Sequence, residues 1–173
     1  CVARHSSTRR LESSVNTERS GGCQCGRVRF RARALSDNAH ICHCRMCQKA
    51  SGGFFGARVG VLLTDLTWTR GQPAEYFSSK GAARGFCSSC GTSLFFHGQG
   101  SERISISIGA FDQPKSIKLD FELGIEGKVP QLEQLASLEN FGTTEEDDPD
   151  GAQIASETSN QHPDHDTEQW APR

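Results

Sequence analysis

Seven cysteines in three short clusters constrain this chain more than any other feature of its sequence. In chain order they are Cys23 and Cys25, then Cys42, Cys44 and Cys47, then Cys87 and Cys90. An odd number of thiols cannot all pair as disulfides within one chain, and the first two cysteines are too close in sequence to bridge each other comfortably. Short Cys-x-Cys and Cys-x-x-Cys turns instead present sulfurs to one tetrahedral ion, most often zinc. We therefore expect metal sites, and not a disulfide scaffold.

The seven sulfurs divide naturally into a closed site and an open one. The stretch "CHCRMC" supplies Cys42, Cys44 and Cys47 within six residues. We call these three cysteines the claw, and they need no distant partner to hold an ion. The two remaining pairs then complete a four-ligand structural zinc site, made of Cys23, Cys25, Cys87 and Cys90. In "FCSSCGTSLFF" a glycine follows the second cysteine of the last pair, as in a zinc knuckle. A site with three protein ligands leaves a position for water or substrate, whereas four ligands close it.

Two alternatives stay open for the claw. A histidine is a common zinc ligand, so His40, His43 or His97 could supply a fourth ligand and close the site. Cysteines alone could also hold an iron–sulfur cluster, although the usual cluster spacings are not repeated here.

The charge distribution predicts one domain between two tails. The chain has 173 residues with 19 Lys+Arg and 21 Asp+Glu, a length suited to one core. Residues 143–173 carry nine acids and one base without apolar periodicity, so we expect a disordered acidic tail. Residues 1–20 contain four arginines and no apolar stretch, and we expect a disordered arm there. The metal-binding domain should therefore span residues 21–142.

The apolar pattern of this domain is that of a mainly β fold. Residues 27–33, "RVRFRAR", alternate arginine with apolar side chains, which predicts a strand whose arginine row faces solvent. The same rhythm predicts strands over residues 102–111 and 117–124. Gly71 and Pro73 predict a hairpin that joins Trp68 to Tyr76. A short helix is expected after the claw in "RMCQKASGG", stopped by its two glycines.

Four motifs, in this order, resemble the glutathione-dependent formaldehyde-activating enzyme family, which also includes centromere protein V. They are "GGCQCGRVRF", "CHCRMCQKASGG", "RGFCSSCGTSLFF" and "ISISIGAFD". The resemblance implies a β-tent fold with short helices, an all-cysteine structural zinc, and a second zinc held by the claw at a glutathione site. It also implies the condensation of glutathione with formaldehyde, a carbon–sulfur lyase activity in reverse. The chain departs from the family pattern in "FELGIEGKVPQLEQL", which lacks the usual histidine and tryptophan.

The candidate site follows from these motifs. With two zinc ions per chain, Cys42, Cys44 and Cys47 would act at the catalytic ion, where zinc favours the thiolate form of an incoming thiol. Glutathione carries two carboxylates, so we expect Arg45, Gln48 and Lys49 beside the claw to bind it, with Arg84, close to Cys87 in the sequence, as a further cation.

Two other functions are compatible with the same cysteine pattern. A glutathione- or zinc-binding protein without turnover would share the same sequence, and a chromatin-associated binding module is known in the same family. The domain lacks a dense basic patch with interleaved aromatics, so we expect glutathione or a related small thiol, and not nucleic acid or membrane, as the partner. Reduced cysteines without a secretory signal predict a cytoplasmic protein.

Overall fold

The computed structural model describes residues 18–171 of the chain. The predicted N-terminal arm lies outside the described residues, except for residues 18–20, and so does Cys1. Arg19 and Ser20 already belong to the first strand. The division of the chain at residues 20 and 142 stays a prediction.

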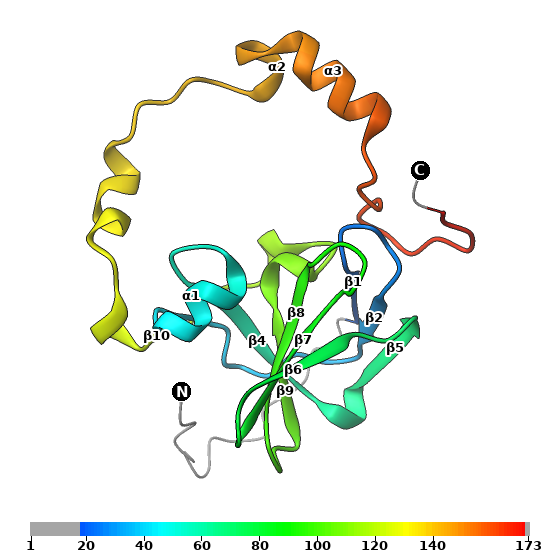
Figure 1. Cartoon of the computed structure of the whole chain (residues 1–173), viewed down its shortest axis with the longest axis vertical. Helices are drawn as coiled ribbons and strands as arrows, with labels where there is room; N and C mark the ends of the chain where they lie inside the picture. Colours follow the sequence, from blue (N-terminus) through cyan, green and yellow to red (C-terminus); the bar gives the residue numbers. More distant parts are fainter. Residues whose placement is uncertain (1–17, 172–173) are drawn as a thin grey trace.

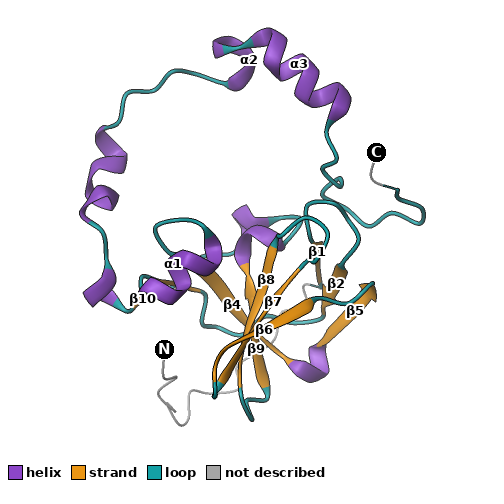
Figure 2. Ribbon diagram, viewed as in Figure 1, coloured by secondary structure: helices purple, strands orange, loops and turns teal. Residues whose placement is uncertain are grey.

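Short strands form most of the body. In chain order they are β1 (Arg19–Gly22), β2 (Arg29–Ala32), β3 (His40–Cys42), β4 (Gly56–Leu62), β5 (Leu66–Arg70), β6 (Ala74–Ser79), β7 (Ala82–Phe86), β8 (Ser93–Gly98), β9 (Arg103–Ser107) and β10 (Phe121–Leu123). β2 and β9 confirm two of the strands predicted from alternation. The fold is mainly β with few short helices, as predicted (Figure 2).

The helices are short and lie mostly at the edges of the body or beyond it. They are α1 (Arg45–Ser51), η1 (Leu63–Asp65), η2 (Ile108–Ala110), η3 (Pro114–Ser116), η4 (Ile125–Gly127), η5 (Pro130–Ser137), α2 (Thr144–Asp147) and α3 (Pro149–Thr158). α1 confirms the predicted helix after the claw, and Gly52 ends it in the left-handed region with φ of 69°. Within residues 18–171, no helix has the length and apolar character needed to cross a bilayer.

Two sheets organise the strands. A three-stranded sheet has the order β1-β2-β5, and a seven-stranded sheet has the order β10-β3-β4-β9-β8-β7-β6. All neighbouring strands are antiparallel except β10 and β3, which run parallel. The parallel pair sits at the edge that carries the claw, because β3 ends at Cys42.

The core lies between the two sheets. Phe30 of β2 is fully buried and meets Trp68 and Phe111 edge-on, with ring centroids 5.8 and 5.1 Å away. The larger sheet contributes Ile106 and Leu94, both at 0 % exposure. Burial of such side chains contributes about 1.5–3 kcal/mol each, so these layers hold the cysteine-bearing loops at their ends.

The predicted hairpin between Trp68 and Tyr76 is wrong. β5 pairs with β2 in the smaller sheet, whereas β6 pairs with β7 at the edge of the larger one. Trp68 packs on Phe30 in the core, which draws β5 to β2, and the chain crosses between sheets at Gly71. This glycine has φ of +57° and a Cβ there would lie 2.2 Å from the carbonyl oxygen of Arg27, so only glycine fits the crossing.

The strand observed at residues 121–123 is shorter than the one predicted over residues 117–124. Only Phe121–Leu123 forms β10, and the preceding Asp120 is hydrogen-bonded to Ala39 through its backbone amide and its carboxylate. These contacts bring the chain to β3 just before β10 begins.

Helices α2 and α3 lie in the C-terminal segment that the sequence predicts to be a disordered acidic tail, and its disorder in solution stays a prediction. After β10 the chain arcs away from the sheets through η5, α2 and α3 and returns beside β1 and β2 (Figure 1). A capping box at Thr143 and Glu146 starts α2, and the Asp148 side chain caps α3. Charged side chains at these helix starts satisfy backbone amides, which composition does not reveal.

Candidate metal centres

The four-cysteine group forms where the two sheets meet. Cys23 and Cys25 lie in the turn between β1 and β2, and Cys87 and Cys90 lie in the turn between β7 and β8. Their four sulfurs are all within 4.8 Å of one another, as the sequence predicted for a shared ion. The group therefore joins segments more than sixty residues apart, and it could hold zinc.

The geometry of the four sulfurs fits a tetrahedral ion. The Sγ atom of Cys25 lies 3.6 Å from that of Cys23 and 3.8 Å from that of Cys87. Zn–S bonds of 2.3 Å at tetrahedral angles place two sulfurs about 3.8 Å apart. The two turns also favour this arrangement of the sulfurs. Val28 N–H donates to Cys23 Sγ over 3.3 Å, and Gly91, which follows Cys90, has φ of 78°. Such turns hold the cysteines in place before metal arrives.

The three-cysteine claw is built at the start of α1. Cys42 ends β3, Cys44 is the N-cap of α1 and Cys47 lies in its first turn. Their sulfurs are within 4.8 Å of one another, with Cys42 and Cys44 at 3.6 Å. Cys42 and Cys47 are buried, whereas Cys44 is half-buried. Solvent therefore reaches the claw on the side of Cys44. This group could also hold zinc.

Two buried arginines point at the sulfur of Cys47. Arg58 of β4 donates from Nη1 over 3.2 Å, and Arg84 of β7 donates from Nη2 over 3.7 Å. Both side chains are nearly inaccessible, at 3 % and 7 % exposure. The Arg84 guanidinium also lies over the Phe96 ring, 5.3 Å from its centroid. Two buried cations favour a negative sulfur at this point.

The pKa values of the claw thiols differ for this reason. Burial alone raises the pKa of Cys47, but the charge of Arg58 and hydrogen bonds that include one from Arg84 lower it to about 7. Burial raises the pKa of Cys42 to about 12. Without metal, Cys47 therefore ionises more readily than Cys42.

The four-cysteine group shows the same contrast. Burial raises the pKa of Cys23 to about 12 and raises that of Cys25. Burial also opposes ionisation of Cys90, but its hydrogen bond with the Thr92 hydroxyl, 3.2 Å away, lowers its pKa to about 6.

No histidine joins either group among the described residues. His43 is fully buried, and its Nε2 atom lies 3.0 Å from Glu122 of β10. His40 bonds through Nδ1 to the carbonyl of Asn38, and His97 bonds through Nε2 to that of Ser101. All three candidate fourth ligands, His40, His43 and His97, therefore have other hydrogen-bond partners.

The predicted glutathione ligands lie on α1, but in different settings. Arg45 and Lys49 are exposed, whereas Gln48 is buried. The Gln48 amide donates to the carbonyls of His43 and Gly127, and its oxygen accepts from Arg45 over 3.2 Å. Gln48 thus fastens α1 to the chain beyond β10. Arg58 was not identified from the sequence as part of the site. The feature that could have revealed it is a charged residue inside the apolar run "GARVGVL".

Comparisons with known proteins agree with the fold and the cysteine pattern. A crystal structure of a Rhodobacter sphaeroides protein superposes with a TM-score of 0.50 at 22% identity, covering 60% of this chain and 98% of that one. This likeness supports the fold alone. No curated protein matches the chain. The family model of the glutathione-dependent formaldehyde-activating enzyme matches residues 18–125, a span that contains all seven clustered cysteines. The chain belongs to the family of glutathione-dependent formaldehyde-activating enzymes.

Proposed function

We propose that this protein is a zinc-dependent carbon–sulfur lyase that acts on the glutathione adduct of formaldehyde, S-hydroxymethylglutathione. The observation that carries the proposal is the three-sulfur claw with Arg58 and Arg84 directed at Cys47. Cys42, Cys44 and Cys47 would hold the reactive zinc, and the four-cysteine group would hold a structural one, giving two ions per chain. The family implies a β-tent arrangement for the two sheets, and we propose residues 21–142 as the metal-binding domain.

The reaction itself requires little beyond a thiolate. When bound, zinc would supply a site that favours the deprotonated form of the substrate sulfur. In the condensation, the glutathione sulfur forms a bond to the formaldehyde carbon, and the thiol proton ends on the oxygen of the new hydroxymethyl group. The lyase direction breaks this C–S bond and returns the proton to sulfur.

Charged side chains beside the claw would balance the negative charge of the cysteine and substrate sulfurs. Three cysteine thiolates and a substrate thiolate exceed the charge of a divalent cation. Arg58 and Arg84 are buried beside Cys47 and would offset this excess where solvent screens little. Arg45 and Lys49 are exposed on α1 and would attract the two glutathione carboxylates. Gln48 would position α1 through its bonds to His43 and Gly127, in addition to the substrate contact predicted from the sequence.

The alternative is a family member that binds zinc and glutathione without turnover. Exchange spectroscopy of the hydroxymethyl protons in mixtures of glutathione and formaldehyde separates the two functions. We expect the zinc-loaded protein to accelerate exchange, and Cys44→Ser to abolish the acceleration while the protein stays folded. Binding of glutathione with exchange at the uncatalysed rate would support the non-enzymatic alternative. We further propose a cytoplasmic location, where thiols stay reduced.

Sulfur binding can be tested apart from turnover. Glutathione should release a proton when it binds, because its free thiol is mostly protonated at neutral pH. An analogue with a hydroxyl in place of the thiol should bind far more weakly. Lys49→Ala should weaken binding by about 1 kcal/mol, as for one partly exposed charged contact, and the exposed Lys80 provides a control as Lys80→Ala. Calorimetry in buffers of different ionisation enthalpy measures affinity and proton release together; equal binding of the analogue would overturn the assignment.

A further inference from the structure

A C-terminal segment returns to the body and lies against the loop of the first two cysteines. We call residues 161–170 the C-terminal strap; they form the returning segment beside β1 and β2 in Figure 1. The backbone N–H of His162 donates to the carbonyl of Gln24 over 2.7 Å. The indole Nε1–H of Trp170 donates to the carbonyl of Cys25 over 2.9 Å. Both bonds therefore end on the turn that carries half of the four-cysteine group.

Charge complementarity fixes the middle of the strap. Asp166 bridges two arginines of β2, with 2.8 Å to Arg29 and 2.7 Å to Arg31. Burial opposes ionisation of Asp166, but the hydrogen bonds from these arginines lower its pKa below the usual value. Arg70 of β5 donates to the carbonyl of Gly26 over 3.1 Å and to the hydroxyl of Thr167 over 3.1 Å. The prediction that the arginine row faces solvent is therefore wrong for Arg29, which is buried, whereas Arg31 is exposed and pairs with Asp166.

Shape complementarity fixes the ends of the strap. Gly26, with φ of 69°, lacks the Cβ that would lie 2.2 Å from the ring of His162 and 2.7 Å from that of Trp170. The two rings meet edge-on over this glycine, with centroids 5.0 Å apart. His162 is 2 % exposed, and burial lowers its pKa, so a neutral ring fits beside Arg70.

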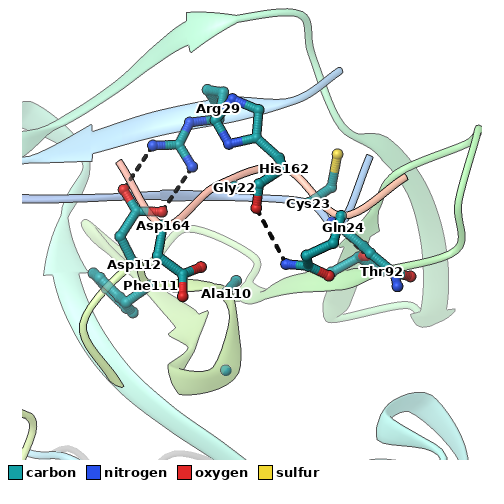
Figure 3. Close-up of a pocket in the computed structure, with 12 residues that line it drawn as sticks. Gly22, Cys23, Gln24, Arg29, Thr92, Ala110, Phe111, Asp112, His162 and Asp164 are labelled. Atoms are coloured by element: carbon teal, nitrogen blue, oxygen red, sulfur yellow. Dashed lines mark hydrogen bonds and ion pairs between the residues drawn. The ribbon is translucent and has the colours of Figure 1, made fainter. Parts of the chain in front are cut away.

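The chain before the strap does not hold it in place. Residues 130–160 contain no buried residue and arc away from the sheets (Figure 1). A cavity of about 140 Å³ remains between strap and body, lined among others by Cys23, Arg29, Asp112 and His162 (Figure 3). The strap is therefore held by its own contacts with β2, β5 and the loop between β1 and β2, and not by the chain that precedes it.

We infer that the body carries a docking surface for an acidic peptide, formed by Arg29, Arg31, Arg70 and the Cys23–Val28 loop, and that its occupant is the chain's own strap. The docked strap clamps the loop and restrains opening of the four-cysteine group. Sulfurs of that group are then reached by reagents or chelators only after the strap has left. This role is independent of the reaction proposed for the claw.

The test compares alkylation rates of individual cysteines in the full, zinc-loaded protein. Asp166→Asn removes both ion pairs at nearly constant shape, and Trp170→Ala removes the indole bond. Either change should speed alkylation of Cys23 and Cys25 by about 5- to 30-fold, the factor that corresponds to loss of one or two such contacts. Glu168→Gln is the matched control, because this exposed acid of the strap makes no ion pair within residues 18–171.

Peptide mapping by mass spectrometry measures alkylation of each cysteine cluster separately. Within residues 18–171 the claw does not contact the strap (Figure 1), so its alkylation rate serves as the control for global unfolding. Unchanged alkylation at the claw together with faster alkylation at Cys23 and Cys25 supports the strap. Equal rates in Asp166→Asn, Trp170→Ala and the control would overturn it. Acceleration at every cluster would also overturn it, because the variants would then act on the whole fold. Protection that grows with protein concentration would instead assign the docked strap to a second copy, and overturn docking within one chain.

Discussion

Arg58 in β4 donates a hydrogen bond to the sulfur of Cys47 in α1, and this contact joins a sheet strand to the claw. The arginine is buried, so its charge acts on the sulfur with little screening. The contact explains why Cys47, and not Cys42, has the lowered pKa.

Removing this cation should raise the pKa of Cys47. In Arg58→Met, after mild chelation has emptied the claw, we expect the pKa of Cys47 to rise from about 7 toward the ordinary value of a thiol, because burial then acts with less opposition. Arg58→Lys should keep part of the effect. The pH dependence of Cys47 alkylation measures the value, and Arg103→Met, at an exposed arginine of β9, is the control. A pKa that stays near 7 in Arg58→Met would show that Arg84 suffices.

The two cysteine groups should differ in what their loss does to the fold. Cys87→Ser removes a ligand that joins the two sheets and should impair folding, since structural zinc sites supply much of the stability of small domains. Cys44→Ser should leave the fold and lower zinc content from two ions to one. Circular dichroism and metal analysis check both variants. A soluble, well-folded Cys87→Ser protein would argue against a structural role for that group.

A buried ion pair between β2 and the segment that follows η2 should matter for stability. Arg29 binds Asp112 with both guanidinium nitrogens, at 2.7 and 2.6 Å, and their side chains are only 4% and 7% exposed. Arg29→Leu leaves the buried Asp112 carboxylate with the Ser20 hydroxyl as its remaining donor and also removes the ion pair with Asp166. It should lower the free energy of unfolding by about 3–5 kcal/mol. The exposed pair of Arg33 with Asp65 provides the control, where Arg33→Leu should cost about 1 kcal/mol or less. Denaturant titration measures both, and equal losses would contradict the expectation.

Zinc retention by the four-cysteine group should weaken as the pH falls. In the metal-free protein burial holds protons on Cys23, with pKa of about 12, and on Cys25, so an arriving ion must displace at least these two. Each unit of lower pH should then reduce apparent zinc affinity by at least about 100-fold near neutrality, because at least two protons compete for the site. Competition with a chelator of known affinity across this pH range gives the slope. A slope near zero would mean that the thiols are already ionised without metal.

The sequence predicted the features that depend on neighbours along the chain. Cysteine spacing predicted both groups, alternation predicted β2 and β9, and Gly52 marked the end of α1. These features arise from local turns and from the two-residue period of strands, which a sequence displays directly.

Features that depend on distant partners could not be predicted in this way. The sheet to which β5 belongs is decided by the packing of Trp68 on Phe30, which are far apart in sequence. Arg84 was placed near Cys87 by sequence distance, whereas in the structure it points at Cys47. The strap was missed because acidic composition hides the few residues, such as Asp166 and Trp170, that contact the body. Composition averages over a segment, but docking depends on single side chains.

The parallel pairing of β10 with β3 has a consequence for how the protein is made. Two hydrogen bonds hold the loop that carries the claw. The backbone N–H of His43 donates to the carbonyl of Leu123 over 2.8 Å, and the Gln48 side-chain amide donates to the carbonyl of Gly127, also over 2.8 Å. A ribosome releases Cys42 long before it has synthesised these partners, about 80 residues later. The nascent chain therefore exposes three thiols on an unsupported loop for several seconds, at about 5–20 residues per second. Correct metal delivery to the claw is thus a problem of timing during translation as well as of affinity.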